Sequence, residues 1–169
     1  MAVTAFLVLG SDGSSTFRGS SAEISTDADR KRFLTMRRKS DVILIGGNTA
    51  RSERYARTPV PLIILSRSRP DVLDQNPLAT WWKLAPEAAV KRAIQEFGPA
   101  VSIEGGINFI GELLQAGAIS QLELSLTPRF GGDATIDFLT LLSHFGKVEK
   151  SQIQDTIFYS CTEPITRQK

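Results

Sequence analysis

Two apolar segments of this chain each end in a pair of glycines, and they constrain the fold more than any other feature. Residues 41–53 read DVILIGGNTARSE, and residues 100–109 read AVSIEGGINF. A buried strand that runs into Gly-Gly and then into a helix brings backbone N–H groups close to a phosphate. Two such turns predict a ligand with several phosphates, such as a nucleotide cofactor. Neither turn is a complete G-x-G-x-x-G, so the standard Rossmann fingerprint is absent.

The alternation of apolar runs with helical patterns predicts one α/β domain over residues 1–169. We expect strands at residues 3–9, 41–45, 60–65 and 100–103, with Trp81 and Trp82 in a further strand. The expected helices run from Thr26 to about residue 39, from a cap at Asn48 or Thr49, from Pro86 to residue 97, and from residue 106 to near residue 117. This order predicts a mostly parallel sheet with helices on both faces.

The last third of the chain has a different period. Leu122, Leu124 and Leu126 alternate with polar residues, which predicts a strand with one buried face and one wet face. Residues 148–152 and 156–162 are expected to form an antiparallel pair joined through residues 154–155. The whole sheet is therefore predicted to be mixed.

Composition excludes several classes of protein. A formal net charge of +2 on 169 residues is too small to indicate nucleic-acid binding, and we interpret the basic run at residues 30–39 as a solvated helix face. No apolar stretch approaches the roughly 20 residues that span a bilayer. A single cysteine and the lack of a secretory signal predict a cytoplasmic protein.

Metal chemistry is not expected. His144 is the only histidine, there is no cysteine cluster, and no carboxylates repeat at the spacing of a metal-binding loop. The leucines and phenylalanine around His144 favour a structural role for it over a catalytic one.

Because parallel strands end at one edge of a sheet, the two glycine pairs are expected to meet there. Glycine allows close backbone approach or a positive φ. Thr49 and Asn108 could donate side-chain hydrogen bonds to phosphate, and a plain turn is the alternative for either glycine pair. Ser66 and Arg67 follow another strand, and a hydroxyl beside a guanidinium suits the 2′-phosphate of NADP. A plain surface turn is the alternative interpretation of Ser66 and Arg67.

Three acids are candidates for chemistry. Glu104 follows an apolar strand, where it is predicted either to accept from a ribose hydroxyl or ring N–H, or to hold the turn. Asp12 lies in a glycine- and serine-rich loop at residues 10–21 that is long enough to be functional. Asp12 and Glu53 are the candidate proton donors for a hydride transfer, and a solvated surface role is the alternative for Glu53.

Taken in order, these motifs resemble the reductase domain of the riboflavin-biosynthesis deaminase–reductase family over most of the chain. Residues 11–13 are similar to the family's Ser-x-Asp-Gly loop, and residues 41–49 to its D-A-I-L-V-G-x-x-T segment. Residues 104–106 resemble its EGG motif, and residues 117–119 the start of A-G-L-I-D-E-L. Ser66-Arg67 resembles its cofactor-discriminating turn, and Pro128 with Gly131-Gly132 its P-x-x-x-G-G.

The resemblance implies a dihydrofolate-reductase-like three-layer fold, NADPH as cofactor and a homodimer. It also implies a 5-amino-6-(5-phosphoribosylamino)uracil reductase, in which hydride passes to C1′ of the open-chain imine to give the ribitylamino product. No separate deaminase domain is expected. The residues implied to contact the cofactor are Gly46, Gly47, Asn48, Thr49, Ser66, Arg67, Gly105, Gly106 and Asn108. The residues implied to face the substrate are Ser11, Asp12, Ser20, Ser21 and Glu104.

The sequence departs from the family where an Ala-Asp-Asp-Pro is usual, because residues 52–55 read SERY. Glu53 keeps a carboxylate at the position of the first acid. Two other functions remain open: a non-catalytic nucleotide-binding protein, and a reductase of another small carbonyl or imine compound. A true dihydrofolate reductase fits less well, and the basic residues are not interleaved with aromatics as in nucleic-acid-binding modules.

Overall fold

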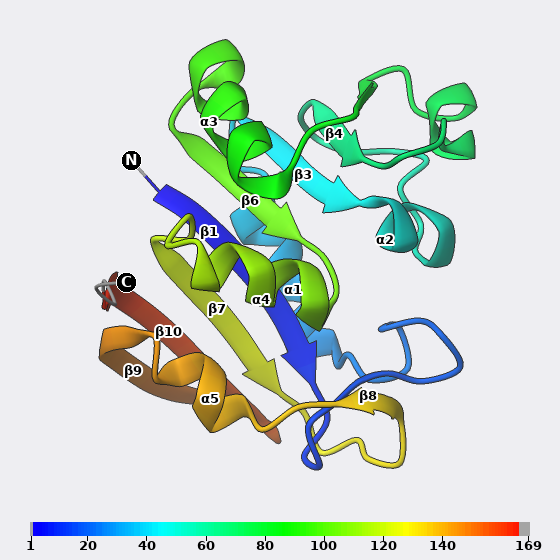
Figure 1. Cartoon of the computed structure of the whole chain (residues 1–169). Coiled ribbons are helices and arrows are strands. Elements are labelled where there is room, and N and C mark those ends of the chain that lie inside the picture. Colours follow the sequence, from blue (N-terminus) through cyan, green and yellow to red (C-terminus); the bar gives the residue numbers. More distant parts are fainter. Residues whose placement is uncertain (1, 166–169) are drawn as a thin grey trace.

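The computed structural model describes residues 2–165. Within these residues the main sheet has the strand order β5-β4-β3-β6-β1-β7-β10-β9 (Figure 1). Its strands are β1 (Ala2–Leu9), β3 (Val42–Gly46), β4 (Leu62–Leu65), β5 (Ala79–Trp82), β6 (Ala100–Glu104), β7 (Gln121–Leu126), β9 (Phe145–Ile153) and β10 (Thr156–Pro164). The strands from β5 to β7 are parallel, and β10 runs antiparallel to both of its neighbours.

The predicted α/β fold with a mixed, mostly parallel sheet is confirmed. Helices lie on both faces of the sheet (Figure 1). They are α1 (Asp27–Arg37), α2 (Gly47–Ser52), α3 (Pro86–Phe97), α4 (Ile107–Gln115) and α5 (Phe138–Leu142), with a 3₁₀ turn η1 (Asp71–Asp74). The predicted antiparallel pair is β9 and β10, which are longer than expected and turn at residues 154–155.

The larger hydrophobic core lies between the sheet and the helices α3, α4 and α5. It takes Val3, Ala5 and Leu7 from β1, Val101 and Ile103 from β6, and Leu122 and Leu124 from β7, all of which are buried. Successive residues of a strand face opposite sides of the sheet. The residues between these buried ones on each strand therefore face α1. The predicted helix from Pro86 to residue 97 is confirmed as α3, and its Val90 and Ala93 are buried in this core.

Helix α1 packs on the sheet by a different means. Thr26 caps its N-terminus, because the Thr26 side chain accepts from the backbone N–H of Asp29. The described buried residues of α1 are Asp29 and Arg37, and its half-buried Phe33 packs on Phe6 of β1 with ring centres 5.7 Å apart. Arg32 donates to Glu123 of β7 at 2.5 Å, and Arg37 donates to Glu104 of β6. Two ion pairs therefore attach this helix to the centre of the sheet.

The wet face predicted for β7 is wrong. Glu123, Ser125 and Thr127 are all buried, because α1 and the segment before it cover that face. The carboxylate of Glu123 accepts from Arg32 and from the hydroxyl of Ser160, and Thr127 donates to the carbonyl of Ile24. Period-2 alternation of polar and apolar residues is the same whether the polar face meets water or a charged helix.

A second sheet was not predicted. The glycine- and serine-rich loop at residues 10–21 contains β2 (Ser14–Thr16), which pairs antiparallel with β8 (Asp133–Thr135). Both strands are short and carry few apolar side chains, so no hydrophobic period marks them. This pairing fixes the loop against residues that lie more than a hundred positions away in the chain.

No helix among residues 2–165 has the length and apolarity needed to cross a membrane. The same residues contain no group of three His, Cys, Asp or Glu side chains arranged to hold a metal ion.

Candidate functional site

A cavity of about 1780 Å³ opens at the carboxyl ends of β3, β4 and β6. Its walls come from α1, α2, the start of α4, and the loop at residues 19–22. Every predicted cofactor residue lines it: Gly46, Gly47, Asn48, Thr49, Ser66, Arg67, Gly105, Gly106 and Asn108. The topology therefore brings the two glycine pairs and the Ser66-Arg67 turn to one opening, because β3, β4 and β6 are parallel.

The two glycine pairs do not use positive φ, which was one predicted reason for them. The described glycines with positive φ are Gly13, Gly19, Gly98, Gly117 and Gly131. The reason is close approach instead. A Cβ on Gly47 would lie 2.8 Å from Oγ of Ser66, and a Cβ on Gly105 would lie 2.8 Å from the ring of Phe109.

Gly106 differs from the other glycines of the site. An added Cβ there meets no protein atom within 4 Å, although the residue lines the cavity and is the N-cap of α4. The backbone N–H groups that open α4 thus border open space, as a phosphate cradle requires. Helix α2 begins in the same way with Gly46 as its N-cap, so the predicted caps Asn48 and Thr49 are wrong and lie inside the helix.

The Ser66-Arg67 turn is fixed by the neighbouring strand β5. The indole N–H of Trp81 donates to the carbonyl of Ser66 at 2.8 Å, and the N–H of Ser66 donates to the carbonyl of Trp82 at 3.3 Å. Arg67 is exposed at the cavity rim, and Arg51 and Lys83 line the same cavity. This end of the cavity carries positive charge suited to a phosphate.

Glu53 lies directly after α2 and holds the loop at residues 19–22. Its carboxylate accepts from the backbone N–H of Ser21 at 2.6 Å and from the hydroxyl of Ser20 at 3.2 Å. All three residues line the cavity. The predicted acid and two of the predicted substrate residues are therefore in direct contact.

Glu104 is only 3% exposed, although it reaches the cavity wall. Arg37 donates to both carboxylate oxygens at 3.1 and 2.9 Å, Tyr55 donates at 2.9 Å, and Ser102 donates at 3.0 Å. Burial raises the pKa of Glu104, and the Arg37 guanidinium with the Tyr55 and Ser102 hydroxyls opposes that rise. Because Glu104 is buried and accepts four hydrogen bonds from the protein, the geometry favours the turn-holding alternative for it over contact with a substrate.

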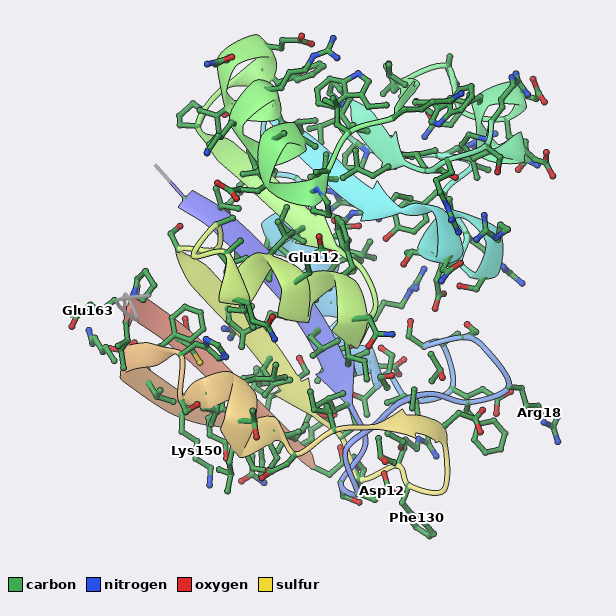
Figure 2. The ribbon with its side chains drawn as sticks, viewed as in Figure 1. Asp12, Arg18, Glu112, Phe130, Lys150 and Glu163 are labelled. Carbon is green, nitrogen blue, oxygen red and sulfur yellow. The ribbon has the colours of Figure 1, made fainter. Side chains whose placement is uncertain are left out.

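Ser11 and Asp12 lie outside the cavity lining, and their roles toward a substrate stay predictions. The carboxylate of Asp12 accepts from the backbone and hydroxyl of Ser14 at 3.1 and 2.6 Å and from the N–H of Gly131 at 2.7 Å. The hydroxyl of Ser11 donates to the carbonyl of Arg129. Asp12 and Phe130 lie at the same loop end of the molecule (Figure 2). These residues join two loops, and the sequence did not distinguish a loop-joining acid from a catalytic one.

A family model, the RibD C-terminal domain, matches residues 2–154. The chain belongs to this family. No curated protein matches the chain in sequence. Three solved structures have a similar fold.

A pyrimidine reductase-like protein from Corynebacterium diphtheriae is 17% identical, with a TM-score of 0.72 and coverage of 98% of this chain and 92% of the other. RibD from Acinetobacter baumannii is 14% identical, with a TM-score of 0.70 and coverage of 98% and 58%. A deaminase/5-amino-6-(5-phosphoribosylamino)uracil reductase from Thermotoga maritima is 16% identical, with a TM-score of 0.69 and coverage of 97% and 56%.

This RibD C-terminal domain also contains site residues that the sequence did not single out. Arg32 and Arg37 belong to the basic run at residues 30–39, which was interpreted as a solvated face, yet both point inward to carboxylates. Tyr55 is buried and bonds to Glu104. One signal was available, since a helix with so few apolar residues must use other side chains to cover a sheet.

Proposed function

We propose that this chain is an NADPH-dependent reductase that converts the ribosyl group of a phosphorylated aminopyrimidine riboside into a ribityl group. Membership of the RibD C-terminal domain family supports an oxidoreductase of riboflavin biosynthesis. The observation that carries the proposal is the convergence of two glycine-led helix starts and the Ser66-Arg67 turn on one cavity. NADPH fits these residues, because Gly106 borders open space in the cavity and a side chain at Gly47 would displace Ser66.

The proposed roles follow from the positions of the side chains. The N-termini of α2 and α4, with Thr49 and Asn108, hold the pyrophosphate, and Ser66 with Arg67 holds the 2′-phosphate. NADPH supplies the hydride that reduces C1′ of the open-chain imine. Glu53 donates the proton that the imine nitrogen gains, so that one hydride and one proton are added in balance. Ser20 and Ser21, which are held by Glu53, position the sugar.

The test compares two cofactors and two arginines. Calorimetric titration of the purified chain with NADPH and NADH is expected to show tighter binding of NADPH. Arg67→Ala is expected to remove most of that preference, since a guanidinium–phosphate pair is lost. Arg69→Ala is the matched control, because Arg69 pairs with Asp74 on the surface two residues further on. A preference that survives Arg67→Ala overturns the role of Arg67, and no binding of either cofactor overturns the proposal in favour of a non-catalytic relative.

Turnover is tested separately by the loss of NADPH absorbance with the aminopyrimidine ribose phosphate as substrate. NADPH binding without turnover of this compound would direct the assignment to a reductase of another small carbonyl or imine. The homodimer and the cytoplasmic location rest on the family resemblance and on composition, and they stay predictions.

A further inference from the structure

The residues around Glu104 form a buried polar cluster at the floor of the proposed cofactor site. Arg37 and Tyr55 are each 8% exposed, and Glu104 is 3% exposed. The guanidinium of Arg37 also lies 4.9 Å from the ring centre of Phe33 and 5.6 Å from that of Tyr55. No buried side-chain nitrogen or oxygen among the described residues lacks a hydrogen-bond partner, so this cluster is fully satisfied.

The cluster joins three segments that are distant in sequence. Arg37 is the last residue of α1, Glu104 is the last residue of β6, and Tyr55 follows α2. Glu104 directly precedes the Gly105-Gly106 turn, so holding its carboxylate also holds the backbone that opens α4. Tyr55 lies two residues after Glu53, so the same carboxylate also anchors the segment that carries the proposed acid.

The segment at residues 53–55 is consequently held from both sides. Glu53 accepts from Ser21 and Ser20 of the loop over the cavity. Tyr55 donates to Glu104 on the opposite side, at the end of β6. A change in the Glu104 cluster would move the phosphate turn and the loop contact together.

We infer that Arg37 and Tyr55 are positioning residues that act through the carboxylate of Glu104 to set the Gly105-Gly106 turn for the cofactor. This inference rests on the proposed function, since the cofactor is the ligand whose binding it predicts. Glu104 is in this view part of the support of the cofactor site and makes no contact with the substrate. A bidentate arginine is suited to the task because its planar fork fixes both oxygens of a carboxylate at once.

The decisive experiment is a double-variant cycle in the full chain, read by calorimetric titration with NADPH. Arg37→Met and Glu104→Gln are each expected to weaken NADPH binding about tenfold, a coupling of the usual size between contacting groups. If Arg37 acts through Glu104, the variant with both changes binds NADPH no more weakly than the worse single variant. Additive losses would overturn the inference.

Two conservative variants separate positioning from a loss of folding. Arg37→Lys keeps one cation, and it is expected to restore part of the affinity that Arg37→Met loses. Tyr55→Phe removes only one hydroxyl, and it is expected to weaken NADPH binding about threefold, the loss of one hydrogen bond of ordinary net strength. If Arg37→Met does not fold, Tyr55→Phe alone decides, and an unchanged affinity overturns the inference.

Arg38→Met is the matched control, because Arg38 is exposed, follows Arg37 directly and lies outside the cavity lining. It is expected to bind NADPH as the unaltered chain does. An unaltered chain that fails to bind NADPH would overturn the proposed function itself. Normal binding by the unaltered chain, with normal binding by both Arg37→Met and Tyr55→Phe, would overturn only the positioning role.

Discussion

The backbone N–H of Ser21 donates a 2.6 Å hydrogen bond to the carboxylate of Glu53, 32 residues away in the chain. The contact closes the loop at residues 19–22 onto the end of α2, at the mouth of the cavity. It also fixes the direction of the only acid that the proposed mechanism uses. A carboxylate held by a backbone N–H cannot swing away from the cavity without opening the loop.

Glu53→Gln is expected to lower turnover on the order of 100-fold, because an amide cannot donate the proton that general acid catalysis supplies. NADPH affinity should stay within about twofold, because the side-chain size and one acceptor oxygen are kept. Steady-state kinetics with calorimetry of the cofactor measures both quantities. Glu112→Gln is the control, since Glu112 is an exposed acid of α4 that also lines the cavity (Figure 2). Full turnover in Glu53→Gln would remove Glu53 as the acid.

Gly106→Ala tests the phosphate cradle with little disturbance to the protein. The new methyl group meets no protein atom within 4 Å, so the melting temperature should fall by only a few degrees, because alanine is a weaker N-cap than glycine. NADPH binding is expected to weaken about tenfold or more, because the methyl group takes the space of the phosphate. Gly111→Ala is the matched control on the same helix. It also has open space, lies outside the cavity lining, and should stabilise the helix by about 0.5–1 kcal/mol. Equal NADPH affinities in the two variants would contradict the cradle.

Gly47→Ala is expected to weaken NADPH binding by a different route. Its methyl group would lie 2.8 Å from Oγ and 3.0 Å from Cβ of Ser66, so the Ser66-Arg67 turn must shift. Because that turn is assigned to the 2′-phosphate, the loss should be larger for NADPH than for NADH. Titration with both cofactors measures the difference, and circular dichroism confirms that the variant is folded. A loss of equal size for both cofactors would argue against the assignment.

Asp12→Ala is expected to lower the melting temperature by roughly 2–4 °C and to leave kcat unchanged. The carboxylate of Asp12 joins two loops outside the cavity. It accepts hydrogen bonds from the Ser14 hydroxyl and the Gly131 N–H, and these bonds hold the pKa of Asp12 below its usual value. A lowered pKa means that the ionised form stabilises the fold above the unfolded-state pKa, and that this contribution is lost as pH falls through the folded-state pKa. The gap in melting temperature between the variant and the unaltered chain should therefore narrow in acid. A large loss of kcat at an unchanged melting temperature would restore Asp12 to the chemistry.

Cys161 is expected to resist alkylation in the native protein. It is fully buried in the core, and burial together with Glu123 raises the pKa of its thiol to about 11. Because the pKa is raised in the folded state, the neutral thiol contributes fully to the free energy of unfolding below the unfolded-state pKa of 9.0. This contribution is lost as pH rises toward about 11. Mass spectrometry after iodoacetamide treatment at about pH 8 should show modification only after unfolding in guanidinium chloride. Rapid labelling of the native chain would contradict this burial.

The local sequence was sufficient to predict the strands of the main sheet and most of the helices that pack on it. The apolar run of β3, the helical spacing of apolar residues in α3 and the glycine pairs each carry their information within about ten neighbouring residues. The parallel order then follows from the alternation of strands and helices, and it brings the Gly-Gly turns to one edge. For this reason the residues predicted to contact the cofactor line one cavity, and their binding of a cofactor stays a prediction.

The hydrogen bonds of Asp12 and Glu53 could not be predicted, because they join residues that are far apart in the chain. Asp12 and Glu53 are both acids near glycine or serine, yet one closes a loop outside the cavity and the other faces into it. Nothing in the neighbouring residues distinguishes these two positions. The pairing of β2 with β8, which draws Asp12 toward Gly131, links segments with no hydrophobic period.

By itself the sequence determined an α/β sheet with two glycine-led helix starts at one opening, since hydrophobic period and turn chemistry are local properties. Only the tertiary structure decided what the charged residues of α1 do. Arg37 meets Glu104 across 67 positions and Arg32 meets Glu123 across 91, so a run that looks solvated in sequence becomes the attachment of a helix to its sheet. Burying a charge without a partner strongly destabilises the fold, whereas a buried charge with a well-placed partner is tolerated. Whether a partner is present depends on packing that only the folded chain defines.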